Sequence, residues 1–307
     1  MKIRIALGSA ILLGLKDGKL DEKPSTVHLL LTDERRCSHD CSFCAQARNS
    51  NADSDLLSRV TWPEFGLNQI IDSMKDAKRI CLQVVDAERT KDMVLEVLRK
   101  LKIISLPISV SLRTFDKGYV DDLFKVGANR VCIALDAACP SLYSIMKGGS
   151  FDHCMNLLLL LANRYPGKIS THLIIGLGET EADVIAVMRR LHKAGITVAL
   201  FAFTPIKGTA LCASPKPDHT YFRRIQLARW LIWNDEDNIV IDDESVVFDI
   251  DKETVRKHIA DIVQTSGCDG CNRPFYNESP RERPYNYASL PDKKTLDEET
   301  EDLLGSI

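Results

Sequence analysis

The sequence has no large excess of charge of either sign. Its 40 lysine and arginine residues are nearly matched by 43 aspartate and glutamate residues, for a formal net charge of -3. Proteins that bind nucleic acid carry a basic patch or stripe that neutralises phosphates. The charge balance therefore argues against nucleic acid as a partner.

Long uncharged apolar runs are also missing. A membrane-spanning helix needs roughly 18 or more apolar residues, and the longest candidate, 155–162, falls well short. Lys2 and Arg4, followed by the apolar segment 5–15, imitate a signal peptide, but the polar run 16–19 stands where a small-residue cleavage site would follow. We expect no membrane partner and a first helix that packs against the protein.

Motifs for nucleotide hydrolysis are absent as well. The sequence contains neither a Walker loop nor a G-x-G-x-x-G motif after a β-rich run, and it shows no internal repeat. Cysteine, in contrast, is well represented, with ten residues in 307. In a chain of this size, closely spaced thiols are typical of metal or redox chemistry in a reducing compartment, and we expect a cytoplasmic protein.

Three of the cysteines form a C-x3-C-x2-C run at Cys37, Cys41 and Cys44, directly after the β-branched segment 27–31. At this cysteine frequency the pattern would arise by chance about 0.01 times. Three thiolates can hold three irons of a [4Fe-4S] cluster, which leaves one iron open to bind another molecule. A structural zinc site, with His39 as a fourth ligand, and a ferredoxin-like electron carrier are the competing interpretations.

After this loop, β-rich runs of five to eight residues alternate with segments of helical apolar spacing. Such alternation predicts a parallel sheet covered by helices, and eight units would make a (βα)8 TIM-type barrel. The expected strands are 27–31, 79–85, 107–112, 130–135, 168–174, 197–203, 238–241 and, more weakly, 272–276. The expected helices are 62–77, 88–101, 119–126, 151–164, 181–194, 219–234 and 252–265.

The chain is thus predicted to divide into three parts. Residues 1–26 form a helical extension, 27–279 the barrel and 280–307 a polar C-terminal tail without a sustained period. The tail either wraps the barrel, docks a partner or stays partly disordered.

The cysteine run, with Phe43 beside its last cysteine, resembles the C-x3-C-x-aromatic-C signature of radical S-adenosylmethionine (radical SAM) enzymes. The segment 172–179 resembles the fifth-strand G-x-I-x-G-x-x-E motif of that superfamily, with His172 in place of its first glycine. Several short segments are similar to biotin synthase, namely 44–46, 135–136, 176–180 and 207–209.

The resemblance implies a reaction. In radical SAM enzymes the open iron binds S-adenosylmethionine, one electron from the cluster cleaves a carbon-sulfur bond, and a 5′-deoxyadenosyl radical abstracts hydrogen from the substrate. Cys37, Cys41 and Cys44 would then be the catalytic cluster ligands, and the protein would supply placement and exclusion of water.

The same resemblance suggests residues that bind S-adenosylmethionine. Asp136 would accept hydrogen bonds from the ribose hydroxyls, although it could instead cap the next helix. Gly176, in the motif that ends at Glu179, would let the backbone approach the adenine, or would serve only the turn. Arg113 suits the methionyl carboxylate because a guanidinium matches it, and a surface ion pair is the alternative. His172 is either a hydrogen-bonded core residue or a contact to substrate or cluster.

A second cysteine pair, Cys268 and Cys271, begins a run that resembles a particular branch of these enzymes. Chance alone would supply about 0.3 such pairs, but the segment 271–278 is similar to the biotin-synthase-like components of two-protein lipoyl synthases. Together with Cys81 on the second expected strand, the pair could hold an auxiliary [4Fe-4S] cluster. Cys132 and Cys139 are further candidates for its fourth ligand.

The departures from biotin synthase matter as much as the matches. Of the three strand cysteines that hold its sulfur-donating cluster, Cys81 alone has a counterpart, and Ser109 and Ser170 occupy the other two positions. Its arginine ligand is replaced in the region 242–244. The biotin synthase type of cluster site is therefore not expected here.

These resemblances predict a radical SAM sulfurtransferase, one component of a lipoyl synthase, that inserts sulfur into an octanoyl chain. The implied partners are an octanoylated lipoyl-carrier protein, a second radical SAM protein, and an electron donor such as ferredoxin or flavodoxin. A mutase or maturase without sulfur donation is the alternative, and an iron-sulfur electron-transfer protein is a third reading.

Overall fold

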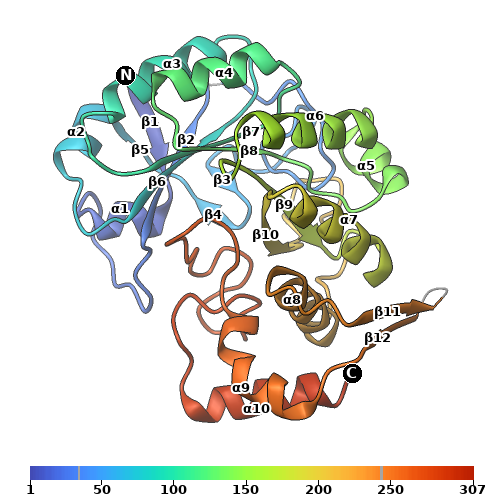
Figure 1. The fold of residues 1–307 in the computed structure, drawn as a ribbon. Helices are drawn as coiled ribbons and strands as arrows, with labels where there is room; N and C mark the ends of the chain where they lie inside the picture. Colours follow the sequence, from blue (N-terminus) through green and yellow to red (C-terminus); the bar gives the residue numbers. More distant parts are fainter. Residues whose placement is uncertain (34, 243–244) are drawn as a thin grey trace.

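A computed structural model describes residues 1–33, 35–242 and 245–307. Its centre is an eight-stranded sheet in which six neighbouring strands run parallel (Figure 1). The parallel strands are β2 (Thr26–Leu31), β6 (Arg79–Val84), β7 (Ile108–Leu112), β8 (Arg130–Ile133), β9 (Ile169–Ile175) and β10 (Thr197–Ala202). All six lie where the sequence predicts strands, and the α/β class with a parallel sheet is confirmed.

Helices follow the parallel strands and bury apolar side chains in a core shared with the sheet. Polar side chains fix where several of them begin: Ser150, Thr180 and Asp218 each accept a hydrogen bond from the first turn. These helices are α3 (Thr90–Leu101), α4 (Lys117–Val126), α5 (Pro140–Lys147), α6 (Phe151–Arg164), α7 (Glu181–Lys193) and α8 (His219–Trp233). Five of the six were predicted, and α5 was not.

The N-terminal segment is more than a helical extension. Strand β1 (Lys2–Ile5) pairs antiparallel with β2 and adds an edge to the sheet before helix α1 (Leu7–Leu12) begins. The edge is extended by β5 (Glu64–Gly66), so the expected helix 62–77 is wrong in its first part. It shortens to α2 (Leu67–Asp72), and β3 (Leu56–Leu57) and β4 (Val60–Thr61) form a small ribbon before it.

Two of the eight expected strands do not join the sheet. The segment 238–241 becomes β11 (Ile239–Asp242), which pairs antiparallel with β12 (Ser245–Phe248) in a separate hairpin, because the two short β-branched runs lie close enough to pair locally. The segment 272–276 is not a strand, since Arg273 and Phe275 have φ values of 37° and 56°, outside the extended region. Of the 242–244 region, residues 243–244 lie outside the described residues.

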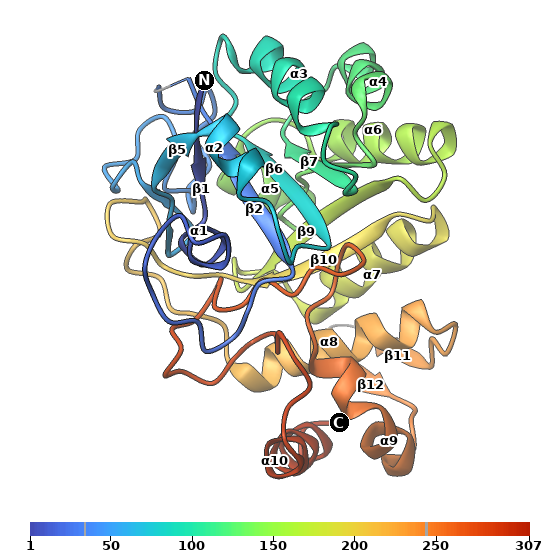
Figure 2. The ribbon, with the colours of Figure 1, turned by 90° about the vertical axis from the view of Figure 1, so that its left-hand side faces the viewer.

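The C-terminal tail is folded. Helices α9 (Lys252–Val263) and α10 (Lys293–Leu304) lie beside α8 below the sheet (Figure 2). The Glu299 carboxylate of α10 lies 2.7 Å from the Arg223 guanidinium of α8, and both side chains are buried. The tail therefore wraps onto the body, as one of the sequence alternatives held. Among the described residues, the helices are all too short or too polar to cross a membrane.

Candidate active site

A cavity of about 300 Å³ lies against the six parallel strands of the sheet. Cysteines from two distant parts of the chain line it. The loop with Cys37, Cys41 and Cys44 follows β2 and lies at the carboxyl ends of the strands. The loop with Cys268 and Cys271 lies at the opposite end, where Arg79 at the start of β6 donates to the Asp269 carbonyl at 3.2 Å. The two cysteine loops thus line opposite ends of one cavity.

Backbone hydrogen bonds to other segments hold the first cysteine loop in place. The amide of Cys37 donates to the carbonyl of Gln46 at 3.0 Å, and the amides of Ser38 and Ser42 donate to the carbonyls of Asp86 and Met146. His39 is paired with Asp86 at 2.8 Å through its Nε2 atom, which argues against a role as a zinc ligand. Hydrogen bonds to three other parts of the chain therefore fix the path of this loop.

The three thiols of this loop lie in a partly apolar environment. Burial raises the pKa of Cys44 to about 12 and also raises the pKa values of Cys37 and Cys41. Metal binding requires thiolates and releases the protons. The described residues contain no group of three or more side chains close enough to hold one metal ion. A cubane cluster spreads its cysteine ligands over several irons, so the three cavity-facing thiols suit a cluster better than a single ion.

Gly208 contacts the backbone at Asn51 and Ala52, in the segment that continues from the first cysteine loop. The Gly208 carbonyl accepts a hydrogen bond from the Asn51 amide at 2.8 Å, and Gly208 has a φ of +92°. A Cβ atom there would lie 2.4 Å from the Ala52 backbone nitrogen. The segment 207–209, noted in the sequence for its likeness to biotin synthase, therefore packs its backbone directly on the cysteine loop.

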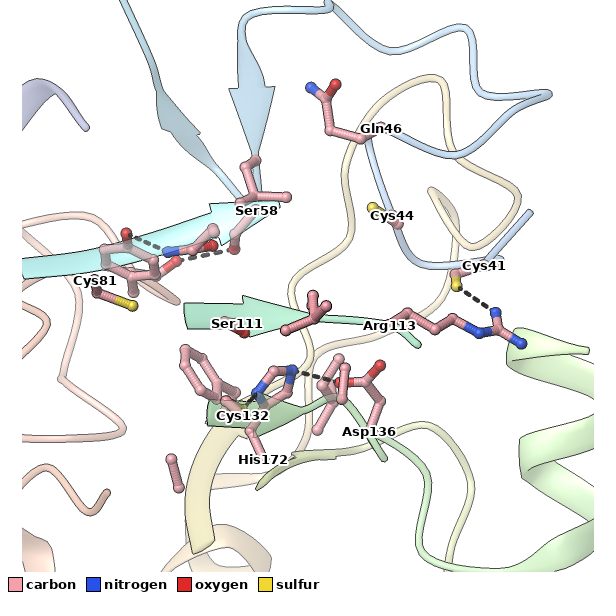
Figure 3. A pocket seen from close by; sticks show the side chains of 18 of the residues that line it. Cys41, Cys44, Gln46, Ser58, Cys81, Ser111, Arg113, Cys132, Asp136 and His172 are labelled. Carbon is pink, nitrogen blue, oxygen red and sulfur yellow. Dashed lines mark hydrogen bonds and ion pairs between the residues drawn. The ribbon is translucent and has the colours of Figure 1, made fainter. Parts of the chain in front are cut away.

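Phe43 and Arg113 both line the cavity beside the first cysteine loop. Figure 3 shows Arg113 reaching toward Cys41, with Nη1 at 3.6 Å from the sulfur. The same guanidinium donates to the carbonyls of Lys147 and Gly148 at 2.8 and 2.7 Å. Arg113 is thus held by backbone carbonyls next to a cysteine, rather than in the surface ion pair that was the alternative.

Asp136 is the centre of a charged group at the carboxyl end of β8. Its Oδ2 atom lies 2.6 Å from Lys147 Nζ and its Oδ1 atom 2.7 Å from His172 Nε2, and its φ is 65°. Burial alone would raise the pKa of Asp136, but Lys147 and His172 hold it well below its usual range. Burial opposes charge on His172 too, yet Asp136 and Cys132 raise its pKa to about 10. Asp136 is therefore an ionised carboxylate facing the cavity, and no helix cap.

Gly176 and Glu179 do not line the cavity. The Glu179 carboxylate turns back on its own loop and accepts hydrogen bonds from the amides of Gly176 at 2.6 Å and Leu177 at 2.9 Å. A Cβ atom on Gly176 would lie 2.9 Å from the Pro217 ring. Their observed contacts fix the loop after β9, so any effect on S-adenosylmethionine would pass through backbone placement.

The second group of thiols gathers at the amino end of the cavity. Cys81 of β6 pairs in register with Ser109 of β7, and the Ser109 hydroxyl lies 3.8 Å from Cys268 Sγ. Burial raises the pKa of Cys81, and charge on Cys271, Cys268 and Cys132 raises it further. All four thiols line the same cavity. All three predicted auxiliary residues line this end of the cavity. Cys81 lies on β6, whereas Cys268 and Cys271 lie on a loop and not at an eighth strand.

Cys271 differs from its neighbours. Burial would raise the pKa of its thiol, but the Arg273 guanidinium and a hydrogen bond to His28 lower it to about 6. Arg273 Nη1 lies 3.8 Å and His28 Nε2 3.9 Å from Cys271 Sγ. Cys132 also lines this end of the cavity, whereas Cys139 is outside it and contacts Ser141.

Several cavity residues were missed in the sequence: His28, Lys147, Arg273 and Tyr276. A histidine in the otherwise apolar strand 27–31 and an arginine two residues after Cys271 were visible signals. Lys147 gave none, because its burial depends on how α5 packs.

Comparison with known proteins agrees with this geometry. The model of the Radical SAM superfamily matches residues 34–201, more than half of the chain. The chain belongs to the radical SAM superfamily. Radical SAM proteins bind a [4Fe-4S] cluster and S-adenosylmethionine, and the thiols Cys37, Cys41 and Cys44 are the candidates to hold that cluster here.

Biotin synthases are among the similar proteins. The enzyme of Dechloromonas aromatica is 26% identical over 205 residues, which cover 63% of this chain and 61% of that protein. The biotin synthase of Schizosaccharomyces pombe is 24% identical over 207 residues, or 63% of this chain and 56% of its own length. The match thus spans less than two thirds of these relatives. The resemblance to the biotin-synthase-like branch is confirmed at this low identity.

The similarity to solved structures is evidence for the fold and for nothing beyond it. The FeFe-hydrogenase maturase HydG from Carboxydothermus hydrogenoformans superposes with a TM-score of 0.55 at 19% identity, covering 69% of this chain and 52% of HydG. Streptococcus suis SuiB bound to S-adenosylmethionine gives a TM-score of 0.51 at 14% identity, covering 69% of this chain and 48% of SuiB. Both share the radical SAM type of fold with this protein.

Proposed function

We propose that this radical SAM protein inserts sulfur at unactivated C-H positions of a protein-bound octanoyl chain, as one component of a two-protein lipoyl synthase. One observation carries the proposal: two groups of cysteines lie at opposite ends of a single cavity. One group would serve radical generation and the other would hold a sulfur-donating auxiliary [4Fe-4S] cluster.

The wall between the two cysteine groups suits an alkyl substrate. Apolar side chains from β2, β6 and β10 and from the loop after β10 line it, namely Leu30, Val84, Phe201, Phe203 and Ile206. An alkyl chain placed there would bury its surface against these residues and be shielded from water. A chain of this kind would lie between the two cysteine loops, within reach of both.

At the carboxyl end the protein's own residues would place S-adenosylmethionine. Cys37, Cys41 and Cys44 would hold the cluster, which with S-adenosylmethionine supplies a 5′-deoxyadenosyl radical. Arg113 would bind the methionyl carboxylate through the guanidinium N–H groups that do not donate to the carbonyls of Lys147 and Gly148. The Asp136 carboxylate, kept ionised by Lys147 and His172, would accept the ribose hydroxyls.

The proposed partners follow from the chemistry of the substrate. An octanoyl chain attached to a lysine must be presented by a lipoyl-carrier protein, and a second radical SAM protein would complete the pair of insertions. Reduction of the cluster would come from a donor such as ferredoxin or flavodoxin. We propose a cytoplasmic location because the thiols must stay reduced to bind iron.

The test is an anaerobic assay of the reconstituted protein with a reductant, S-adenosylmethionine, an octanoyl-lysine carrier and its suspected partner. We expect 5′-deoxyadenosine together with a mass gain on the carrier that reflects sulfur. A Cys268→Ala/Cys271→Ala variant should still form deoxyadenosine but add no sulfur, and a Cys41→Ala variant should form neither. Deoxyadenosine without sulfur addition by the wild-type protein would refute the lipoyl assignment.

A mutase or maturase without sulfur donation is the second candidate. The replacement of two biotin synthase cluster positions by Ser109 and Ser170 favours it, since both serines lie buried in this cavity. Iron counting separates the two functions. About four irons per chain would favour this candidate, and about eight, reduced to about four in the Cys268→Ala/Cys271→Ala variant, would favour sulfur donation.

A further inference from the structure

Cys132 is a buried thiol that lines the cavity, and the sequence offered it as one candidate for the fourth ligand of the auxiliary centre. It lies on β8 between Ser111 of β7 and Ser170 of β9, its partners in the sheet register. Its side chain faces the cavity at the end where Cys81, Cys268 and Cys271 gather. Together these residues make a group of four thiols, three from the proposed auxiliary set and one from β8.

Two other polar side chains at this end, Ser109 and His28, are already engaged. Ser109 accepts a hydrogen bond from Arg79 at 2.9 Å and lies against Cys268. His28 directs Nε2 at Cys271 and packs its ring on Tyr276, with centroids 5.2 Å apart. Two serines remain: Ser111, which lines the cavity in register with Cys132, and Ser170, whose buried hydroxyl has no hydrogen-bond partner among the described residues. A thiolate is the preferred ligand of iron-sulfur clusters, which favours Cys132 over both serines.

Cys132 is also connected to the other end of the cavity. His172 Nδ1 lies 3.4 Å from Cys132 Sγ, while His172 Nε2 is bound to Asp136 at 2.7 Å. The imidazole therefore joins the Cys132 thiol to the Asp136 carboxylate beside the first cysteine loop, and Figure 3 shows its contact with Asp136. Hydrogen bonds to ligand sulfurs raise the reduction potential of a cluster.

We propose that Cys132 is the fourth ligand of the second iron-sulfur centre, with His172 hydrogen-bonded to its sulfur. The inference rests on the auxiliary centre of the proposed function and adds a property to it. A centre with four cysteine ligands has no open iron, whereas the centre at Cys37, Cys41 and Cys44 keeps one. S-adenosylmethionine would then bind at one end of the cavity only.

The experiment isolates the second centre. In a Cys37→Ala/Cys41→Ala/Cys44→Ala background, the protein is reconstituted anaerobically, its iron is counted, and the reduced protein is examined by EPR before and after addition of cyanide, which binds open irons. We expect about four irons per chain and a spectrum that cyanide does not change. Adding Cys132→Ala should create an open iron and a cyanide-dependent shift of the spectrum.

Two further variants keep the result clear if Cys132→Ala loads iron poorly. Cys132→Ser preserves the shape of the side chain and should shift the spectrum without cyanide, because an oxygen replaces the sulfur. His172→Gln should retain the iron and lower the midpoint potential. Cys212→Ala, an exposed cysteine outside the cavity, is the matched control and should behave as the background does.

The possible failures are distinguishable. A cyanide response already present in the background, or unchanged spectra in both Cys132 variants, overturns the assignment of Cys132 and leaves the second centre intact. A cyanide response caused by Ser170→Ala or His28→Ala in place of Cys132→Ala gives the fourth position to another residue and overturns it equally. A background protein without iron, or one whose iron survives Cys268→Ala/Cys271→Ala, refutes the auxiliary centre itself and this inference with it.

Discussion

Lys147 Nζ lies 2.6 Å from Asp136 Oδ2, and both residues are buried. The lysine is the last residue of α5 and reaches back to the loop after β8, where it also donates to the Leu135 carbonyl at 3.4 Å. A buried cation and anion in contact are costly to separate, because each alone would lack compensation for its lost hydration. The pair thus ties α5 to the residue proposed to bind ribose.

Replacing Lys147 by methionine should lower the free energy of unfolding by about 3 kcal/mol, since it leaves Asp136 buried with His172 as its remaining charged partner. Chemical denaturation of the apoprotein at neutral pH measures the change. Lys125→Met is the matched control, because Lys125 pairs with Asp122 on the surface at 2.8 Å and an exposed pair should contribute little. Equal effects of the two substitutions would show that the buried pair does not stabilise the fold.

Gly208→Ala should impair iron loading at the first cysteine loop. The added Cβ atom would meet the Ala52 backbone at 2.4 Å and displace the loop that carries the three cysteines. Gly195→Ala is the matched control: Gly195 also has a positive φ, of +67°, but nothing lies within 4 Å of its Cβ position. Both variants pay roughly 1–2 kcal/mol of backbone strain, so a selective loss of iron in Gly208→Ala isolates the clash. Full iron binding in Gly208→Ala would contradict the bracing role.

Acid should weaken the attachment of α10. Burial would raise the pKa of Glu299, but hydrogen bonds from Arg283 and Arg223 lower it from 4.5 to about 2. A carboxyl group with a depressed folded-state pKa contributes stability that is present above pH 4.5 and is lost as the pH falls toward 2. Glu299→Gln should therefore be clearly less stable than wild type at pH 7, with a smaller difference at pH 3.

Urea unfolding at several pH values tests this expectation. Glu301→Gln is the control, since Glu301 pairs with Arg256 at 3.1 Å on the exposed side of the same helix. Its effect should stay below about 1 kcal/mol at each pH. A difference between wild type and Glu299→Gln that does not change with pH would exclude the ion pair as its source.

The sequence predicted the six parallel strands correctly, but it did not predict that the last two expected strands stay out of the sheet. Runs such as 79–85 and 168–174 combine β-branched residues with flanking helical patterns, and both became parallel strands. The segment 272–276 looked similar locally, but the backbone at Arg273 and Phe275 turns to positive φ to carry Cys271 and Arg273 into the cavity. That conformation follows from packing against the rest of the molecule, which local composition does not reveal.

The candidate site was predictable where a motif marked it. Cys37, Cys41, Cys44, Arg113 and Asp136 were all identified from the sequence, and all line the cavity. Long-range partners escaped prediction. The sequence left His172 as either a core residue or a contact to substrate or cluster. Its contacts with Asp136 and Cys132 depend on the register of β8 and β9, and the burial of Lys147 depends on α5.

In the proposed reaction, sulfur passes from the protein's own second centre to the substrate. The most direct measurement is a single turnover with protein reconstituted with ³⁴S-sulfide, followed by mass spectrometry of the octanoyl-lysine carrier. We expect ³⁴S on the carrier with the wild-type protein, and none with Cys268→Ala/Cys271→Ala, which still forms 5′-deoxyadenosine. Unlabelled sulfur on the carrier, or labelled sulfur delivered by the Cys268→Ala/Cys271→Ala variant, would rule out sulfur transfer from the second centre.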